Sequence, residues 1–175
     1  MDLINYNLSW RRKVVLIHDY FPTSILQALD REIDSATWQD YPQAHRQSAV
    51  PPKGDTHEYL STVTQDHVST WAGRELALAS WQLWRDTEGL TYNKHTDLGT
   101  FKAPEYHIQI YLGSGDTGMG TCFYNNMFTH KPTIQLSYTR NAGYFMSRPQ
   151  FIYHSVAPVP RNQCRLSIIA RYKHA

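Results

Sequence analysis

Residues 106–112 have the sequence YHIQIYL, and this alternation predicts a strand with two different faces. Successive side chains of a strand point to opposite sides of the sheet. The apolar side would carry Tyr106, Ile108, Ile110 and Leu112, and the other side His107, Gln109 and Tyr111. For one strand alone, the simplest interpretation is a sheet with its apolar face on the core and its polar face in water.

Two further segments alternate in the same way. In residues 164–172 (CRLSIIARY), Leu166, Ile168 and Ala170 oppose Arg165, Ser167 and Ile169. In residues 90–97 (LTYNKHTD), Asn93, His95 and Asp97 share the face opposite Tyr92, Lys94 and Thr96. The polar faces of the three segments are rich in His, Asp, Gln, Tyr, Arg and Ser and poor in Lys and Glu. This composition favours an open barrel whose lumen holds a polar site and whose outside packs under helices.

The chain after about residue 79 consists of short apolar segments separated by turn-forming residues. We expect strands near 79–85, 90–97, 105–113, 119–125, 132–138, 142–147, 150–155 and 164–172. Eight short, evenly spaced strands predict an antiparallel sandwich or barrel. The fold class is therefore mainly β with N-terminal helices.

The first 78 residues are expected to support this barrel. A strand is predicted over 14–20, a helix over 23–34 and a second helix over 66–78, with both helices covering an outer sheet face. Residues 38–57 contain three Pro and a Gly and predict an irregular loop. That loop is either a lid with Tyr41, His45 and Arg46 as contacts or a plain connection. We expect one domain over 1–175, with 79–175 as the barrel core.

Composition excludes several classes of protein. The chain has 175 residues, 41% of them hydrophobic, which fits one folded domain and not a disordered chain. A net charge of +2 gives no electrostatic case for a nucleic-acid partner. The apolar runs are too short for a membrane span, and the N-terminus MDLINYNLSW lacks a signal pattern. The two cysteines show no C-x-x-C spacing, so we expect a reducing, cytoplasmic setting.

The triplet His95-Thr96-Asp97 is the most specific local feature. Its outer residues share a strand face and can direct an imidazole nitrogen and a carboxylate oxygen at one point. His154, at the end of another predicted strand, is the best candidate for a third ligand, and His107 is the alternative. Two His and one carboxylate form the facial triad of non-haem Fe(II) oxygenases, although the same donors accept Zn, Co or Mn.

Arg165 and Ser167 follow His154 after the turn VAPVPRNQ. A neighbouring antiparallel strand could bring them near the metal. A guanidinium beside a hydroxyl is a good receptor for a carboxylate, because Arg presents a planar fork of donors.

These pieces resemble the Fe(II)/2-oxoglutarate-dependent dioxygenases, in particular the small prolyl-hydroxylase-like branch. The matching segments are HTD (95–97), QIYL (109–112), GTCFY (120–124), YHSV (153–156) and RLS (165–167), in the family's order. Two positions depart from its usual pattern. Prolyl hydroxylases often have Lys where Arg165 stands, and the family's glycine pair appears here as Gly118-Met119-Gly120.

The resemblance implies a double-stranded β-helix, or jelly roll. It implies Fe(II) bound by His95, Asp97 and His154, with no catalytic residue beyond these ligands. It further implies 2-oxoglutarate bound through its distal carboxylate by Arg165, Ser167 and Tyr111. The implied reaction consumes O2, releases succinate and CO2, and hydroxylates a peptide side chain such as prolyl or a small molecule.

Two other classes use the same residues. A cupin-like metalloenzyme could employ the three ligands for hydrolysis or isomerisation without 2-oxoglutarate. A non-catalytic jelly-roll module could use the polar lumen to bind a sugar or peptide.

Overall fold

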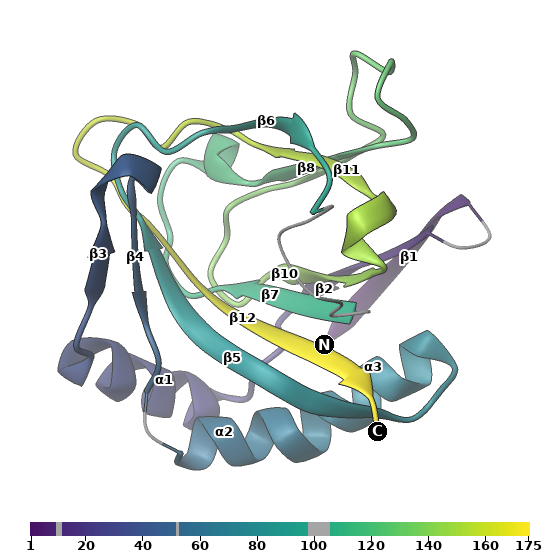
Figure 1. Cartoon of the computed structure of the whole chain (residues 1–175). Helices are drawn as coiled ribbons and strands as arrows, with labels where there is room; N and C mark the ends of the chain where they lie inside the picture. Colours follow the sequence, from purple (N-terminus) through teal and green to yellow (C-terminus); the bar gives the residue numbers. More distant parts are fainter. Residues whose placement is uncertain (10–11, 52, 98–105) are drawn as a thin grey trace.

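Two antiparallel sheets face each other in the computed structural model (Figure 1), which describes residues 1–9, 12–51, 53–97 and 106–175. The larger sheet has the strand order β1 (Asp2–Ser9), β2 (Arg12–His18), β10 (Gly143–Ser147), β7 (Tyr106–Tyr111), β12 (Arg165–His174), β5 (Leu76–Asp86), β4 (Arg46–Ala49) and β3 (Gln39–Tyr41). The smaller sheet has the order β6 (Tyr92–His95), β11 (Tyr153–Val156), β8 (Thr121–Tyr124) and β9 (Ile134–Leu136). All eight strands expected after residue 79 are therefore present, and the mainly β class is confirmed.

The helices lie under the larger sheet, on the side away from the smaller one (Figure 1). They are α1 (Thr23–Ser35), α2 (Asp55–Tyr59) and α3 (Gln65–Ala72), the last two joined by one π-helical segment over Leu60–Thr64. Short 3-10 turns occupy Pro42–Ala44, Thr117–Met119 and Pro149–Phe151. In the described part of the chain, no helix has the length and apolar character needed to cross a membrane.

The alternation in the sequence corresponds to two separate cores. Between the helices and the larger sheet lie Val15, Ile17, Leu29, Ile108, Ile110, Ile168 and Ala170, among others. Between the two sheets lie Val14, Leu16, Tyr111, Phe123, Leu136 and Tyr144, among others. A strand of the larger sheet thus has one face toward the helices and the other toward the interior between the sheets, as the alternation predicts.

The N-terminal third contains more sheet than expected. The expected strand 14–20 is β2, and the expected helix 23–34 is α1. However, β1 was not predicted, and residues 38–57 form the β3–β4 hairpin and the start of α2 in place of an irregular loop. The predicted helix 66–78 is wrong at both ends. It ends at Ala72 because Gly73 adopts the left-handed conformation, with φ of +70°, that commonly caps a helix.

Strand β6 contains an irregularity that changes its faces. His154 on β11 pairs with His95, but Val156 pairs with Tyr92, so three steps on β6 oppose two on β11. This extra residue is a β-bulge, which reverses the alternation of the bulged strand. Tyr92 consequently faces the same cavity as His95, and not the opposite side as the simple alternation predicts.

Candidate metal centre and active-site cavity

Three side chains meet at the mouth of the space between the sheets. His95 and Asp97 come from β6 and the residues just after it, and His154 lies opposite His95 on β11. The Asp97 carboxylate lies 3.8 Å from His95 Nε2 and 3.7 Å from His154 Nε2. One ligand atom from each residue falls within 4.8 Å of the others. The structure thus brings together all three residues that the sequence selected as metal ligands.

The backbone fixes which nitrogen each imidazole offers. Nδ1 of His95 lies 2.7 Å from the carbonyl oxygen of Asn93, and Nδ1 of His154 lies 3.0 Å from that of Ile152. A carbonyl oxygen only accepts, so each Nδ1 must donate. Each Nε2 then carries the lone pair in the neutral ring and faces Asp97, which is the tautomer that a metal site needs.

Burial also favours the neutral form of His154. Only 7% of its side chain is exposed, and this burial lowers its pKa, although the nearby Asp97 charge acts in the opposite direction. Because a metal binds the neutral imidazole, this shift keeps His154 available as a ligand.

Arg165 reaches the same cavity from β12, and it is only 1% exposed. Its Nε and Nη2 donate to one oxygen of Asp86 at 3.0 and 2.5 Å, and its Nη1 donates to the carbonyl of Met119 at 2.9 Å. Burial acts to lower the pKa of Arg165, but the adjacent Asp86 carboxylate, together with Tyr111 and Tyr144, raises it, and the net result is a pKa above the usual value. Arg165 is therefore a fixed, fully charged group.

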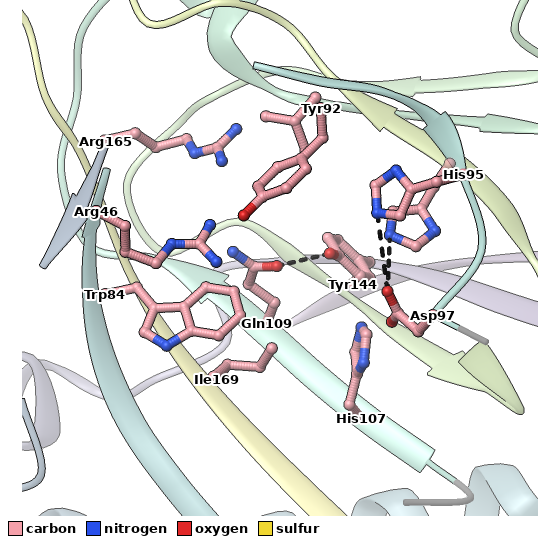
Figure 2. Close-up of a pocket in the computed structure, with 12 residues that line it drawn as sticks. Arg46, Trp84, Tyr92, His95, Asp97, His107, Gln109, Tyr144, Arg165 and Ile169 are labelled. Carbon is pink, nitrogen blue, oxygen red and sulfur yellow. Dashed lines mark hydrogen bonds and ion pairs between the residues drawn. The ribbon is translucent and has the colours of Figure 1, made fainter. Parts of the chain in front are cut away.

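The cavity has a volume of about 160 Å³. Figure 2 shows the arginines on one side of it and the His95–Asp97 pair on the other. Its lining comprises Arg46, Trp84, Tyr92, His95, Asp97, His107, Gln109, Tyr144, His154, Val156, Arg165 and Ile169. An outer groove of about 230 Å³ shares Arg46, Trp84 and Tyr92 with it. The inner space is smaller than the roughly 300–1,000 Å³ of pockets for drug-sized ligands, so it suits a small molecule.

One buried imidazole in this cavity is not a member of the triad. His107 is 3% exposed, and its Nε2 has no hydrogen-bond partner among the described residues. Its ring centre lies 5.6 Å from that of Tyr144. The sequence offered His107 as an alternative third ligand, but the group of mutually close ligand atoms contains His154 and not His107.

Ser167 and Tyr111, the other two residues expected to bind the cosubstrate, lie behind the residues that line the cavity. Ser167 is fully buried and accepts a hydrogen bond of 2.9 Å from Gln109 Nε2, while Gln109 Oε1 accepts one of 2.6 Å from Tyr144. The Tyr111 hydroxyl lies 2.7 Å from that of Thr121. Neither Ser167 nor Tyr111 belongs to the lining of the cavity.

Sequence reasoning missed several lining residues. Trp84, Tyr144 and Val156 were not placed in the lumen, Tyr92 was assigned to the wrong face, and Arg46 was considered only as a lid contact. The missing information is the pairing of strands: Arg46 and Arg165 both align with Asp86, on either side of β5. No local signal in the sequence reveals that register.

Comparisons with known proteins rest on structure, because no protein-family model and no curated protein sequence matches the chain. A 2OG-Fe(II) oxygenase family oxidoreductase from Burkholderia pseudomallei is similar with a TM-score of 0.73 and 17% identity, over 91% of this chain and 84% of that one. The non-haem α-ketoglutarate-dependent epimerase SnoN from nogalamycin biosynthesis is similar with a TM-score of 0.71 and 15% identity, over 94% of this chain and 79% of that one. A Pseudomonas putida prolyl-4-hydroxylase is similar with a TM-score of 0.65 and 14% identity, over 93% of this chain and 92% of that one.

These likenesses cover nearly the whole chain and show its fold. The protein is a double-stranded β-helix of the kind found in the 2-oxoglutarate- and iron-dependent oxygenases, as the sequence segments implied.

Proposed function

We propose that this protein is an Fe(II)- and 2-oxoglutarate-dependent oxygenase that hydroxylates a small-molecule or peptide substrate. One observation carries the proposal: a single cavity holds a His-Asp-His group at one side and a buried guanidinium at the other. This pair of features matches a metal chelated by a 2-oxo acid whose distal carboxylate needs a cationic partner.

The donors present fit Fe(II). Two imidazoles with free Nε2 atoms and one carboxylate on the same side leave open coordination positions, as in other facial triads. When bound, Fe(II), 2-oxoglutarate and O2 supply the oxidising chemistry, with succinate and CO2 as co-products. The similar SnoN has been solved with Fe3+ and α-ketoglutarate.

The protein's own residues would bind the metal and the cosubstrate, orient them and close the cavity. His95, Asp97 and His154 would hold the metal, and Arg165 would receive the distal carboxylate of 2-oxoglutarate. In this proposal Ser167 positions Gln109, which lines the cavity, whereas Tyr111 contacts Thr121, which lies outside the lining. Tyr144 and His107 are buried in the wall of the cavity and would help to exclude water from it.

The substrate would enter through the outer groove, because the inner cavity has room only for a small acid. The groove suits a small molecule or a peptide side chain, and the net charge of +2 does not favour a nucleic acid.

Both cysteines are free, and Cys164 is exposed, which supports a reducing cytoplasmic setting. We also propose that residues 1–175 act as one domain.

The proposal is tested by metal, absorption and product measurements on one preparation. Anaerobic Fe(II) with 2-oxoglutarate should give a weak visible charge-transfer band, and aerobic incubation should release succinate. Asp97→Ala should abolish metal binding and both signals. Asp34→Ala, on the exposed surface of α1, should retain all three.

The alternatives predict different results. Metal binding without either 2-oxoglutarate signal would support a cupin-like metalloenzyme, and folded protein that binds no metal would support a binding module. If succinate is released, a screen of peptides, amino acids and nucleic acids for increased release identifies the substrate class.

A further inference from the structure

Three charged side chains form a row across three strands beside the cavity. Arg46 on β4 and Arg165 on β12 both pair in register with Asp86 on β5. Nε of Arg46 donates to one oxygen of Asp86 at 2.5 Å, and Arg165 donates to the other oxygen. The exposed fractions of the side chains are 14% for Arg46, 0% for Asp86 and 1% for Arg165. One carboxylate therefore holds both guanidinium groups in place, that of Arg165 fully buried and that of Arg46 partly exposed.

This row carries an unbalanced positive charge. Two guanidinium groups face one carboxylate, and burying a charge without a partner is costly. Among the described residues, Asp97 is the only acidic one lining the cavity, and it lies against His95 and His154 on the opposite side. One more anionic group beside the two arginines would neutralise this positive charge.

Arg46 is the more available of the two arginines. Arg165 uses Nε and both Nη atoms for Asp86 and Met119. Among the described residues, Arg46 has a hydrogen bond only through Nε, and its guanidinium stacks 3.7 Å from the ring centre of Trp84. Figure 2 shows this guanidinium extending into the cavity below Arg165. Stacking and the Asp86 contact fix its plane and leave its Nη atoms for a ligand.

We propose that Arg46 is a second anchor for the distal carboxylate of 2-oxoglutarate, held beside Arg165 by their shared partner Asp86. The inference rests on the proposed function and adds a residue to it. A carboxylate has two oxygens and four lone-pair sites, so it can accept from two guanidinium groups at once. The cosubstrate would then neutralise the surplus charge of the row.

Arg46 also borders the outer groove, so the alternative is that it binds substrate. Its contact with Asp86, which also holds Arg165, favours the inner ligand. The two roles separate when cosubstrate binding is measured without any substrate.

The experiment compares two ligands on the Mn2+-loaded protein by calorimetry. The ligands are 2-oxoglutarate and 2-oxopentanoate, which has the same carbon chain without the distal carboxylate. Arg46→Met preserves the stem that packs on Trp84 and removes the charge. The matched control is Arg85→Met, because Arg85 also stacks on a tryptophan, 4.1 Å from the ring centre of Trp38, but does not line the cavity.

We expect Arg46→Met to raise the Kd for 2-oxoglutarate by about 10- to 100-fold, as for the loss of a charge-assisted hydrogen bond. The Kd for 2-oxopentanoate should stay unchanged, and Arg85→Met should alter neither. Arg46→Lys, which retains a charge, should bind 2-oxoglutarate with intermediate affinity; it serves as the test variant if Arg46→Met does not fold.

The results that would overturn the proposed function differ from those that would overturn the inference about Arg46. A parent protein that does not bind 2-oxoglutarate overturns the proposed function. A parent that binds it as tightly as the Arg46 variants overturns only the inference and assigns Arg46 to the substrate groove. An equal loss of affinity for 2-oxoglutarate and 2-oxopentanoate also overturns the inference, because the effect would not depend on the distal carboxylate.

Discussion

His95 and His154 each donate from Nδ1 to a backbone carbonyl two residues earlier in the chain. Those contacts leave Nε2 of each ring facing Asp97, which arranges the donors of the proposed metal site without a metal. Asp86 has a comparable role on the other side of the cavity, where it fixes two guanidinium groups. At the scale of residues, the site is therefore held by polar groups that do not themselves serve as ligands.

Asp86 should matter greatly for stability. Asp86→Asn removes the charge that both Arg46 and Arg165 face, and breaking a buried ion pair costs about 3–5 kcal/mol. Asp30→Asn removes an exposed ion pair with Arg140 and should cost at most about 1 kcal/mol. Urea denaturation of both variants checks this difference. Similar losses in the two variants would contradict the role given to Asp86.

His107 should make the protein sensitive to acid. Burial, with smaller contributions from His154 and Arg171, lowers the pKa of His107 well below its ordinary value of 6.5. Below pH 6.5 the unfolded chain binds a proton there that the folded protein does not, so the free energy of unfolding falls as pH falls. Because the unfolded histidine is already half protonated at pH 6.5, one such proton accounts for about 1 kcal/mol between pH 6.5 and 5.5.

The measurement is urea denaturation of the metal-free protein at pH 7.5, 6.5 and 5.5. His107→Gln should reduce the loss of stability on acidification, whereas His130→Gln, at an exposed position, should show the parent's pH dependence. The prediction is wrong if all three proteins lose the same amount.

At the scale of elements, the close contact of β10 with β7 brings Tyr144 to Gln109 and forms the floor of the cavity. Gly143 begins β10 between β2 and β7. A Cβ at this position would lie 2.0 Å from the carbonyl oxygen of Gln109 and 2.6 Å from the Cδ1 atom of Ile110. The strand spacing at this point thus depends on glycine.

Gly143→Ala should therefore destabilise the protein by about 1–3 kcal/mol, as other substitutions that overfill a packed core do. Gly54→Ala is the control, because its nearest neighbour would be a side-chain atom of Glu32 at 3.8 Å. Gly54 is the N-cap of α2, where Gly is preferred to Ala, so the effect of this substitution should stay within about 1 kcal/mol. Thermal and urea unfolding of the two variants give the comparison. A Gly143 variant as stable as the Gly54 variant would show that the strands separate easily.

At the scale of the whole molecule, the cavity forms only when both sheets are assembled. Its lining comes from β4, β5, β6, β7, β10, β11 and β12, which span the chain from residue 46 to residue 174. A ligand that binds this cavity binds the folded state and not the unfolded chain. Binding and global stability are therefore linked.

Mn2+ together with 2-oxoglutarate at about 100 times its Kd should stabilise the fold by about 2.7 kcal/mol. For a chain of this size, that corresponds to a rise in Tm of about 5–11 °C. Differential scanning fluorimetry with metal alone, cosubstrate alone and both together measures it. An equal rise for 2-oxoglutarate with and without metal would place its binding outside the proposed site.

The sequence by itself determined the faces of most strands and selected the three residues of the His-Asp-His group. Strand periodicity is a local property, so the alternation around Ile108 and Ile168 separated the helix-facing core from the polar lumen. His95 and Asp97 are two residues apart, and His154 could be chosen from residue type and spacing. Local signals failed where a single residue changes the pattern, at the bulge of β6 and at the helix end before Gly73.

Only the tertiary structure decided which distant side chains share the cavity. The row formed by Arg46, Asp86 and Arg165 depends on β5 lying between β4 and β12, and on their exact register. Strand order and register result from packing that involves the whole chain, whereas side-chain alternation results from the backbone of one strand. For this reason the His-Asp-His group was predictable. The place of the second arginine was not, nor was the lack, among the described residues, of a hydrogen-bond partner for Nε2 of His107.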